Sequence, residues 1–352
     1  MLDGTDAVLI SIDLPAGEGG RQEFRELIES WPAFGVSAHR VVHGGDRFKS
    51  GVLIDELVVE ELEKLAVLAP LHNPPALAGI RTLREVRPEL PSVACFDTAF
   101  HDTLPPEVAT YGIPWEWTEQ LGVRRFGFHG LSHSYAARRA AEMIGRPPED
   151  VKVVTCHLGA GASLAAVAGG RSVDTTMGFT PLEGLIMSTR SGSFDPGALL
   201  WLQEQLDLSP AAMTDKLEHS AGLLGMSGLS GDMREILAAA DKGELRSRLA
   251  LSAYAHRVRC GIAAMAASMG GADAIVFTGG VGESSPRVRE LACRGLHFLG
   301  VELNAQRNAE AYDDAEISSL TAATKVFLIK AREDLEVAAE TRRILRVRRK
   351  ER

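Results

Sequence analysis

The sequence predicts an α/β protein of two domains, with mixed β-sheets flanked by helices. Its 352 residues exceed the size of one ordinary domain core. Hydrophobic residues make up 45% of the chain and charged residues 24%, which is the balance of a globular protein. Short apolar runs joined by glycine turns fill the middle of the chain, and helical patterns alternate with strand patterns after them.

The first hundred residues contain apolar runs of strand length and of helix length. The expected strands are residues 7–12, 36–43 and 92–96, and the expected helices are residues 22–31, 55–66 and 76–86. Pro74 and Pro75 precede the third helix, and paired prolines predict an irregular backbone there. Asp97 directly follows the last of these strands.

The spacing of apolar residues and glycines changes after residue 150. Three short strands, residues 151–156, 163–167 and 172–175, are separated by glycine turns, which is typical of an antiparallel meander. The remaining expected elements are a helix at 245–269, strands at 274–278 and 326–329, a helix beginning near Pro286, and a terminal helix at 334–347.

The net charge and the sequences of the two termini limit the kinds of partner and the cellular location that we expect. A net charge of −9 argues against a general nucleic-acid surface. The basic run in residues 342–352 is typical of a solvated helix end. The N-terminus lacks the pattern of a signal peptide, and no apolar run approaches the length of a membrane span. We therefore expect a cytoplasmic protein that associates with neither nucleic acid nor membrane.

Two glycine segments are candidate anion sites. In residues 277–284 an apolar strand runs into glycines and then into a helix start, where backbone N–H groups favour an anion. A plain βα turn explains this segment equally well. In residues 156–161 a glycine turn joins two strands and can place N–H groups around a phosphate. Taken alone, a simple hairpin turn is the more common explanation of that segment.

Four polar residues stand in apolar or glycine-rich surroundings. A buried arginine needs an anionic partner, so Arg40 and Arg190 each predict either a structural carboxylate or a substrate. A histidine such as His129 is more often a satisfied core residue than a functional one. Asp97, at the end of a strand, is equally suited to capping a helix. None of these signals decides a function alone.

Together the segments resemble the acetate kinase family. The matching motifs, in the family's order, are residues 39–45, 71–75, 96–101, 127–130, 177–184 and 277–283. The resemblance runs from about residue 36 to the C-terminus. It implies the two-domain actin-like ATPase (ribonuclease H-like) fold, with residues 1–98 and 336–352 in an N-terminal domain and residues 99–335 in a nucleotide-binding domain. It also implies a homodimer.

The same resemblance implies an activity and a set of site residues. The activity is reversible transfer of the γ-phosphoryl group of ATP to acetate, with Mg²⁺ or Mn²⁺, and propionate or butyrate is the alternative acid. Asp97, His129 and Arg190 are implied as catalytic, Arg40 and His72 as substrate-binding, and Glu333 as the metal ligand. The acyl pocket is implied to consist of Val42, Leu71, Phe128 and Pro181. Nucleotide contacts are implied for His157, Leu158, Gly159, Ala160, Gly161, Asp232, Met233, Arg234, Gly280, Val281, Gly282, Glu283 and Ser284.

Elementary chemistry refines one of these roles. Acetate is already ionised at pH 7, so its attacking oxygen needs no general base. Phosphoryl transfer depends mainly on positioning and on neutralising oxygen charge. We therefore interpret Asp97 as an orienting or metal-linked group rather than as an acid or base.

The sequence departs from the family in three places. Nothing matches the family's opening strand and its glycine-serine turn, so the first domain is expected to lack its first strand or strands. Ala160 stands where the family has Asn, which removes a side-chain hydrogen bond of about 1–3 kcal/mol. Ala331 and Arg332 stand where the family usually has Thr followed by Asn or Asp. Either the start was assigned too late, or this is an impaired nucleotide-binding paralogue. We expect a family enzyme that is weak or inactive in the form given.

Overall fold

The computed structural model describes residues 1–3, 6–12, 14, 18–69 and 72–351. Contacts within the chain divide it into two compact units. Unit 1 consists of Met1–Phe100 and Arg332–Arg352, and unit 2 consists of His101–Ala331. The functional domain boundaries expected from the sequence stay a prediction, and each unit is described by itself.

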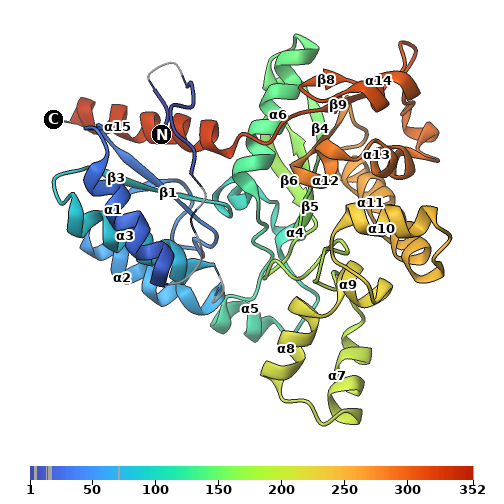
Figure 1. Cartoon of the computed structure of the whole chain (residues 1–352), viewed down its shortest axis with the longest axis horizontal. Helices are drawn as coiled ribbons and strands as arrows, with labels where there is room; N and C mark the ends of the chain where they lie inside the picture. The colour runs from blue at the N-terminus through green and yellow to red at the C-terminus, as the bar shows by residue number, and fades with distance from the viewer. Residues whose placement is uncertain (4–5, 13, 15–17, 70–71, 352) are drawn as a thin grey trace. The chain divides into compact units, whose positions relative to one another are not determined.

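Unit 1 is a small sheet covered by helices (Figure 1). Its strand order is β1-β3-β2, with β1 parallel and β2 antiparallel to β3. Helix α3 packs against β1, whereas the C-terminal helix α15 packs against both β1 and β3. Its elements are α1 (Glu18–Ser30), β1 (Ser37–Val41), β2 (Val52–Leu53), α2 (Glu56–Leu65), α3 (Asn73–Val86), β3 (Ser92–Phe96) and α15 (Glu333–Glu351).

The core of unit 1 forms where apolar side chains of the sheet meet those of α2 and α3. Phe48 and Phe96 stack with ring centroids 4.8 Å apart, and Leu62 and Ile80 are fully buried in the same cluster. This packing holds the carboxyl end of β3 rigidly, and Asp97 follows there. Asp55 caps α2 by accepting a hydrogen bond from the N–H of Val58.

Unit 2 is built on a six-stranded sheet in the order β6-β5-β4-β7-β9-β8. Strands β4, β5 and β6 form an antiparallel meander, β4, β7 and β9 are parallel, and β8 is antiparallel to β9. Its strands are β4 (Lys152–Leu158), β5 (Ala162–Ala168), β6 (Arg171–Thr175), β7 (Ala274–Thr278), β8 (Ala315–Glu316) and β9 (Lys325–Leu328). The expected mixed sheet is confirmed.

Helices cover both faces of this sheet (Figure 1). Helix α6 packs against β4 and β7, and α11 packs against β4, β5 and β6. The helices are α4 (Pro106–Ala109), α5 (Trp115–Leu121), α6 (Gly130–Ile144), α7 (Pro196–Gln205), α8 (Pro210–His219), α9 (Gly222–Ser227), α10 (Met233–Asp241), α11 (Leu245–Ser268), α12 (Gly279–Ser284), α13 (Pro286–Cys293) and α14 (Ala305–Glu310).

Two local expectations were wrong. Residues 7–12 form no strand, and Val8 makes only an isolated bridge to Leu2. Pro74 and Pro75 do not interrupt the chain but lie in the first turn of α3, which begins at Asn73. Proline is tolerated there because the first N–H groups of a helix have no partner within the helix.

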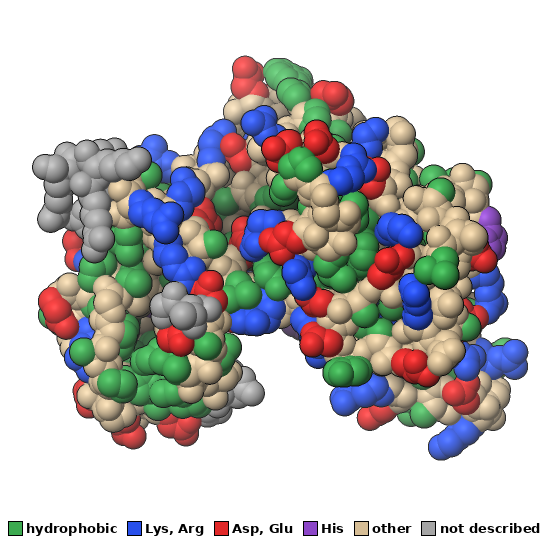
Figure 2. Space-filling view, turned by 90° about the horizontal axis from the view of Figure 1, so that it is seen from above, with side chains coloured by type: hydrophobic (Ala, Val, Ile, Leu, Met, Phe, Trp, Pro, Cys, Tyr) green, Lys and Arg blue, Asp and Glu red, His purple; other side chains and the backbone are tan. Residues whose placement is uncertain are grey.

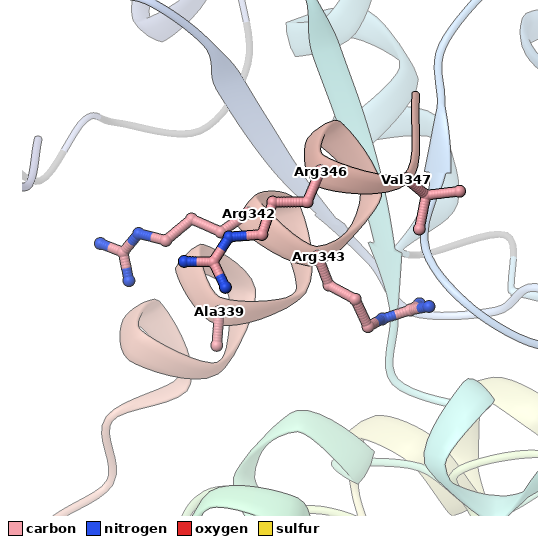
Figure 3. A pocket seen from close by; sticks show the side chains of 5 residues that line it. All are labelled: Ala339, Arg342, Arg343, Arg346 and Val347. Atoms are coloured by element: carbon pink, nitrogen blue, oxygen red, sulfur yellow. The ribbon is translucent and has the colours of Figure 1, made fainter. Parts of the chain in front are cut away.

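Charged side chains of both signs are mixed on one face of the protein. Figure 2 shows acidic and basic side chains interspersed among the described residues on the face that it displays. The basic C-terminal run lies on α15, where a cavity of about 400 Å³ is lined by Arg342, Arg343 and Arg346 together with two apolar residues. Arg342 and Arg346 extend from the same side of the helix in Figure 3. Arg342 pairs with Asp6, and Arg343 pairs with Glu340, so two of the three guanidinium groups have carboxylate partners.

No helix in the described part of the chain is both long enough and apolar enough to cross a bilayer.

A buried histidine couples the stability of unit 2 to pH. His101 donates through Nε2 to the carbonyl oxygen of Phe128 (3.0 Å), and its Nδ1 lies 2.7 Å from the Ser172 hydroxyl. Burial lowers the pKa of His101 to about 4, although the hydrogen bond to Phe128 opposes the shift. The folded protein therefore resists a proton that the unfolded chain accepts near pH 6.5. Stability is retained above pH 6.5 and is lost as the pH falls towards 4.

We expect His101→Gln to weaken this pH dependence. Between pH 7 and 4.5 the parent protein should lose about 2.5 kcal/mol more unfolding free energy than the variant. Urea denaturation at the two pH values measures the difference. His297→Gln, which changes an exposed histidine, should leave the dependence unchanged. An equal loss in the parent and in His101→Gln would contradict the assignment.

Candidate active site

Two glycine turns meet at one edge of the sheet in unit 2. Strands β4 and β7 are parallel neighbours with His157 opposite Thr278, so the turns that follow them lie side by side. A Cβ atom on Gly159 would lie 4.0 Å from the amide nitrogen of Gly280. Gly279 adopts φ +77°, and a Cβ there would lie 2.9 Å from the carbonyl oxygen of Leu158. The close packing of the two turns therefore requires glycine at position 279, whereas a Cβ at position 159 would make only an ordinary contact with Gly280.

A cavity of about 580 Å³ opens beside the two turns. This volume is typical of a small-molecule site. The lining comprises both glycine turns, the start of α10 and the start of α13. Of the residues implied to bind nucleotide, it includes Gly159, Ala160, Asp232, Met233, Arg234, Gly280, Val281 and Ser284. The others that line it are Leu237, Asp241, Ser285, Pro286 and Arg287.

Carboxylates hold the two arginines of the cavity. The guanidinium of Arg234 donates hydrogen bonds to both carboxylate oxygens of Asp232. Asp232 also caps α10 by accepting a hydrogen bond from the backbone N–H of Arg234 at 2.8 Å. These hydrogen bonds lower the pKa of Asp232 to about 2. Arg287 pairs with Asp241 at 2.8 Å. The rim of the cavity is thus polar but close to neutral.

The remaining residues implied for nucleotide binding lie outside the cavity lining, namely His157, Leu158, Gly161, Gly282 and Glu283. The Glu283 carboxylate accepts hydrogen bonds from the N–H groups of Gly279 (3.0 Å) and Ala331 (2.9 Å). In this position it links the glycine turn to the segment after β9. Leu158 and Gly282 are buried.

His129 and Arg190 converge on Gly161, the second glycine of the first turn. A Cβ on Gly161 would lie 3.4 Å from Cε1 and Nε2 of His129 and 3.7 Å from Nη1 of Arg190. The ring of His129 stacks on that of His157, with centroids 4.4 Å apart. His129 has φ +56°, a left-handed conformation, and α6 begins at the next residue. One imidazole and one guanidinium therefore flank a turn that also lines the cavity.

Arg190 is anchored by a residue that the sequence analysis missed. Its Nε lies 2.6 Å from Oε2 of Glu218 on α8, and both side chains are mostly buried. Nothing in the sequence marks Glu218, because it stands among ordinary charged residues of an amphipathic helix 28 residues later. The structural-carboxylate alternative for Arg190 is therefore present, and Nη1 still points to Gly161.

Arg40 and Asp97 form a bidentate pair in unit 1. Arg40 Nε lies 2.9 and 3.1 Å from the two oxygens of Asp97, and Nη2 lies 2.7 Å from Oδ2. Burial alone would lower the pKa of Arg40, but the adjacent Asp97 charge raises it overall. Nη1 of Arg40 lies 4.0 Å from Glu333 at the start of α15. The residues implied for substrate binding (Arg40), catalysis (Asp97) and metal binding (Glu333) are thus neighbours.

The residues implied for the acyl pocket fall in both units. Val42 and His72 are half-buried in unit 1, where His72 precedes α3. Phe128 is 1% exposed in unit 2, and Pro181 is half-buried there. Leu71 lies outside the described residues.

Comparison with known proteins places the chain in a family. A model of the acetokinase family matches residues 24–339. The chain belongs to the acetokinase family. An acetate kinase of Microcystis aeruginosa is 49% identical over 305 residues, which cover 87% of this chain and 76% of that protein. The expected family is therefore confirmed.

Solved structures of acetokinase-family proteins share the fold. The crystal structure of Porphyromonas gingivalis acetate kinase matches with a TM-score of 0.86 and 39% identity, covering 90% of this chain and 80% of that one. A propionate kinase from Francisella tularensis matches with a TM-score of 0.82 and 40% identity, covering 86% and 78%. The expected actin-like α/β fold is confirmed.

A three-residue clasp holds the acetokinase-family segment that contains Pro181. Glu183 accepts from the hydroxyl of Tyr111 (2.5 Å) and from Arg125 (2.8 Å), and the Tyr111 hydroxyl accepts from the N–H of Phe179 (2.9 Å). Gly178 lies directly against this clasp. A Cβ there would lie 1.7 Å from Glu183 Oε2 and 2.1 Å from the Tyr111 hydroxyl.

The few carboxylates near Arg40 suit a metal ion that is bound mainly by the phosphates of the nucleotide substrate. Among the described residues, no group of three or more His, Cys, Asp and Glu side chains is arranged to hold an ion. Mg²⁺ typically takes one or two protein carboxylates together with substrate phosphates. The carboxylates of Asp97 and Glu333, both beside Arg40, fit that pattern.

Proposed function

We propose that this acetokinase-family chain is an acetate kinase, which transfers the γ-phosphoryl group of ATP to acetate to form acetyl phosphate and ADP. The observation that carries this proposal is the convergence of His129 and Arg190 on Gly161, in a turn that lines the cavity. Relatives named acetate kinase, 45–49% identical over most of the chain, support it. The phosphotransferase activity and the use of ATP and ADP follow from the family.

Within this function each residue group has a distinct task. The cavity beside β4 and β7 takes the nucleotide, whose phosphates lie towards the glycine turns. Arg190 and His129 neutralise the oxygens of the phosphoryl group as it moves, which is the main requirement of this reaction. Acetate needs no general base because it is already ionised.

Arg40 holds the acetate carboxylate. Its Nε and Nη2 already bind Asp97, so Nη1 is the edge of the guanidinium from which it donates to acetate. Asp97 orients Arg40, and His72 contributes to substrate binding. The family resemblance implies that Val42, Leu71, Phe128 and Pro181 contact the acetate methyl group. One additional methylene changes discrimination by only about 1–3 kcal/mol, so slow turnover of propionate is expected.

Mg²⁺, or Mn²⁺ in its place, is held by Glu333 with support from Asp97. When bound, the ion neutralises phosphate charge during transfer. A cytoplasmic location stays a prediction.

A hydroxamate assay tests the function. The protein is incubated with ATP, Mg²⁺, hydroxylamine and one acid at a time, and we expect acyl hydroxamate mainly from acetate. Faster turnover of propionate or butyrate would assign a different acid to the same site. ATP binding by calorimetry without hydroxamate from any acid would establish a nucleotide-binding paralogue instead.

We also propose that the chain forms a homodimer through the surface of α7. This helix has no buried residue, and it exposes Leu200 (66%) and Trp201 (58%). Contiguous exposed apolar side chains are typical of a protein interface, and a second copy of the chain is the occupant that the family resemblance implies.

Trp201→Glu should shift the molar mass measured by light scattering from dimer to monomer, because a charge in an apolar interface loses its hydration. Tyr312→Glu changes a residue that is 83% exposed away from α7 and should leave the mass unchanged. A dimer that persists in Trp201→Glu would remove α7 from the interface.

A further inference from the structure

A chain of hydrogen bonds runs from the interior of the sheet to His129. Ser163 Oγ lies 2.8 Å from Nδ1 of His129 and 2.8 Å from Nε2 of His133. Nδ1 of His133 lies 2.7 Å from Oγ1 of Thr155, whose hydroxyl donates in turn to the carbonyl oxygen of Ala165. Ser163, His133 and Thr155 have no exposed surface.

The fold brings these groups together on one face of the sheet. Ser163 on β5 is opposite His157 on β4, and Thr155 stands two residues before His157, so all three side chains share a face. His129 and His133 are separated by one helical turn at the start of α6, where the His133 N–H donates to the His129 carbonyl at 2.9 Å. Both rings therefore face the sheet.

The carbonyl oxygen of Ala165, at the end of the chain farthest from His129, determines which group donates in each hydrogen bond. The Thr155 hydroxyl lies 3.4 Å from the carbonyl oxygen of Ala165, which can only accept, so we assign the hydroxyl proton to this contact and let Thr155 accept from Nδ1–H of His133 (2.7 Å). His133 is completely buried, which lowers its pKa well below the usual value and keeps it neutral. With its one proton on Nδ1, His133 accepts at Nε2 from the Ser163 hydroxyl. Ser163 has then spent its proton and must accept from Nδ1–H of His129.

From this order of donors we propose that Ser163 and His133 are positioning residues that hold a proton on Nδ1 of His129, so that Nε2 of His129 carries a proton only when the ring is an imidazolium. Nε2 is the atom on the Gly161 side of the ring. A neutral ring would present a lone pair there, which repels a phosphoryl oxygen. The imidazolium presents an N–H, which binds one.

The surroundings of His129 then couple its proton to the ligand. The titratable and charged groups around the ring include His157 (4.4 Å between centroids), His133 (6.4 Å) and Arg190 across Gly161, with Glu218 behind Arg190. Burial keeps His133 neutral, so the positive charge of Arg190 is what favours a neutral His129 in the free protein. Phosphate oxygens entering beside Nε2 reverse that balance. Binding of a nucleotide phosphate is therefore accompanied by proton uptake at His129.

The direct test does not require catalysis. In protein labelled with ¹⁵N-histidine, long-range ¹H–¹⁵N correlation spectra report which nitrogen carries the proton, and loss of a signal in His129→Gln assigns His129. Above its pKa, His129 should show the proton on Nδ1. A neutral His129 ring in the parent protein that carries its proton on Nε2 would overturn the proposal, whatever the enzymatic activity.

Variants of this hydrogen-bond chain, which we call the relay (Thr155, His133, Ser163 and His129), give a second test. Ser163→Ala removes the acceptor, and the neutral ring should move towards the Nε2–H form. Thr155→Val breaks the far end of the relay and should loosen the preference if Ser163→Ala does not fold. Ser172→Ala removes another buried hydroxyl that meets a histidine, His101, and should leave the His129 signal unchanged. An Nδ1 proton that persists in both Ser163→Ala and Thr155→Val would overturn the role of the relay.

Two functional readouts separate positioning from folding. Calorimetry of ATP binding in buffers of different ionisation enthalpy should show proton uptake in the parent protein and less uptake in Ser163→Ala. Under the proposed function, kcat should fall as the pH rises in the parent and fall less steeply in Ser163→Ala, whose neutral ring can donate from Nε2. No hydroxamate product from a parent protein with the Nδ1–H signature would sink the proposed function and leave this inference standing. Equal proton uptake in the two proteins would contradict it.

Discussion

Arg190→Ala is expected to lower kcat for acetyl phosphate formation by about 10³-fold or more, with little effect on ATP affinity. Arginines that neutralise charge on a transferring phosphoryl group typically contribute this much. Arg190 is held for the task, since Glu218 binds Nε at 2.6 Å and Nη1 lies beside Gly161. Arg190→Lys keeps a positive charge but loses the planar fork, so its kcat should fall between the two.

Glu218→Gln separates the charge of Arg190 from its orientation. The amide keeps a hydrogen-bond acceptor but loses the ion pair, so a smaller loss of kcat is expected with KM almost unchanged. Arg139→Ala is the matched control, because Arg139 is also a paired arginine of unit 2 but bonds to Asp314 away from the glycine turns. A kcat for Arg190→Ala within tenfold of the parent would remove Arg190 from the transfer step.

Arg289→Met is expected to reduce the free energy of unfolding by about 3–5 kcal/mol. Arg289 is fully buried, and burial lowers its pKa to about 10. Keeping the Arg289 guanidinium charged in this buried position destabilises the folded protein by about 3 kcal/mol, and Arg289→Met removes that cost. Against this, the guanidinium donates to the carbonyls of Gly282 (2.9 Å), Glu283 (2.8 Å) and Asn308 (2.6 Å) and to the Asn308 amide oxygen (2.7 Å).

Each buried acceptor left without a donor costs about 1–3 kcal/mol, so the lost hydrogen bonds outweigh the recovered desolvation. Urea denaturation measures the loss, and Arg294→Met, which changes an exposed arginine at the end of the same helix, serves as the control. Because Gly282 and Glu283 belong to the second glycine turn, ATP affinity should weaken as well. An unfolding midpoint equal to that of the control would show that the carbonyls find other donors.

The elements that the sequence predicts best are those whose pattern of apolar residues is compatible with only one type of secondary structure. The buried strands β3 and β7 match the expected ranges 92–96 and 274–278, because short runs of β-branched and apolar residues end sharply at polar or glycine positions. The meander β4–β6 and helix α11 also match closely. Helix α6 was not predicted, although it positions His129 and His133. Its alanine-rich, histidine-containing surface lacks a clear apolar stripe.

The predictable part of the candidate site is its backbone. The glycine turns at 159–161 and 279–282 are visible in the sequence because glycines that directly follow an apolar strand mark a tight turn. Side-chain partners are less visible, since they depend on tertiary contacts between distant segments. The carboxylate partners of the two arginines illustrate this: Asp97 is 57 residues from Arg40, and Glu218 lies on a separate helix from Arg190. Ser163 reads as an ordinary strand residue, and only the structure shows it between two imidazoles.

The hydrogen atom on Cα of Gly178 limits how this protein can be engineered. Any side chain there would displace the Glu183 carboxylate or the Tyr111 hydroxyl, which together hold Phe179 and the backbone leading to Pro181. A mutant library aimed at bulkier acids therefore gains nothing from diversity at positions 111, 178 and 183, where most members would misfold locally. Randomisation belongs at Pro181 and its apolar neighbours, which can change size while the clasp beneath them stays intact.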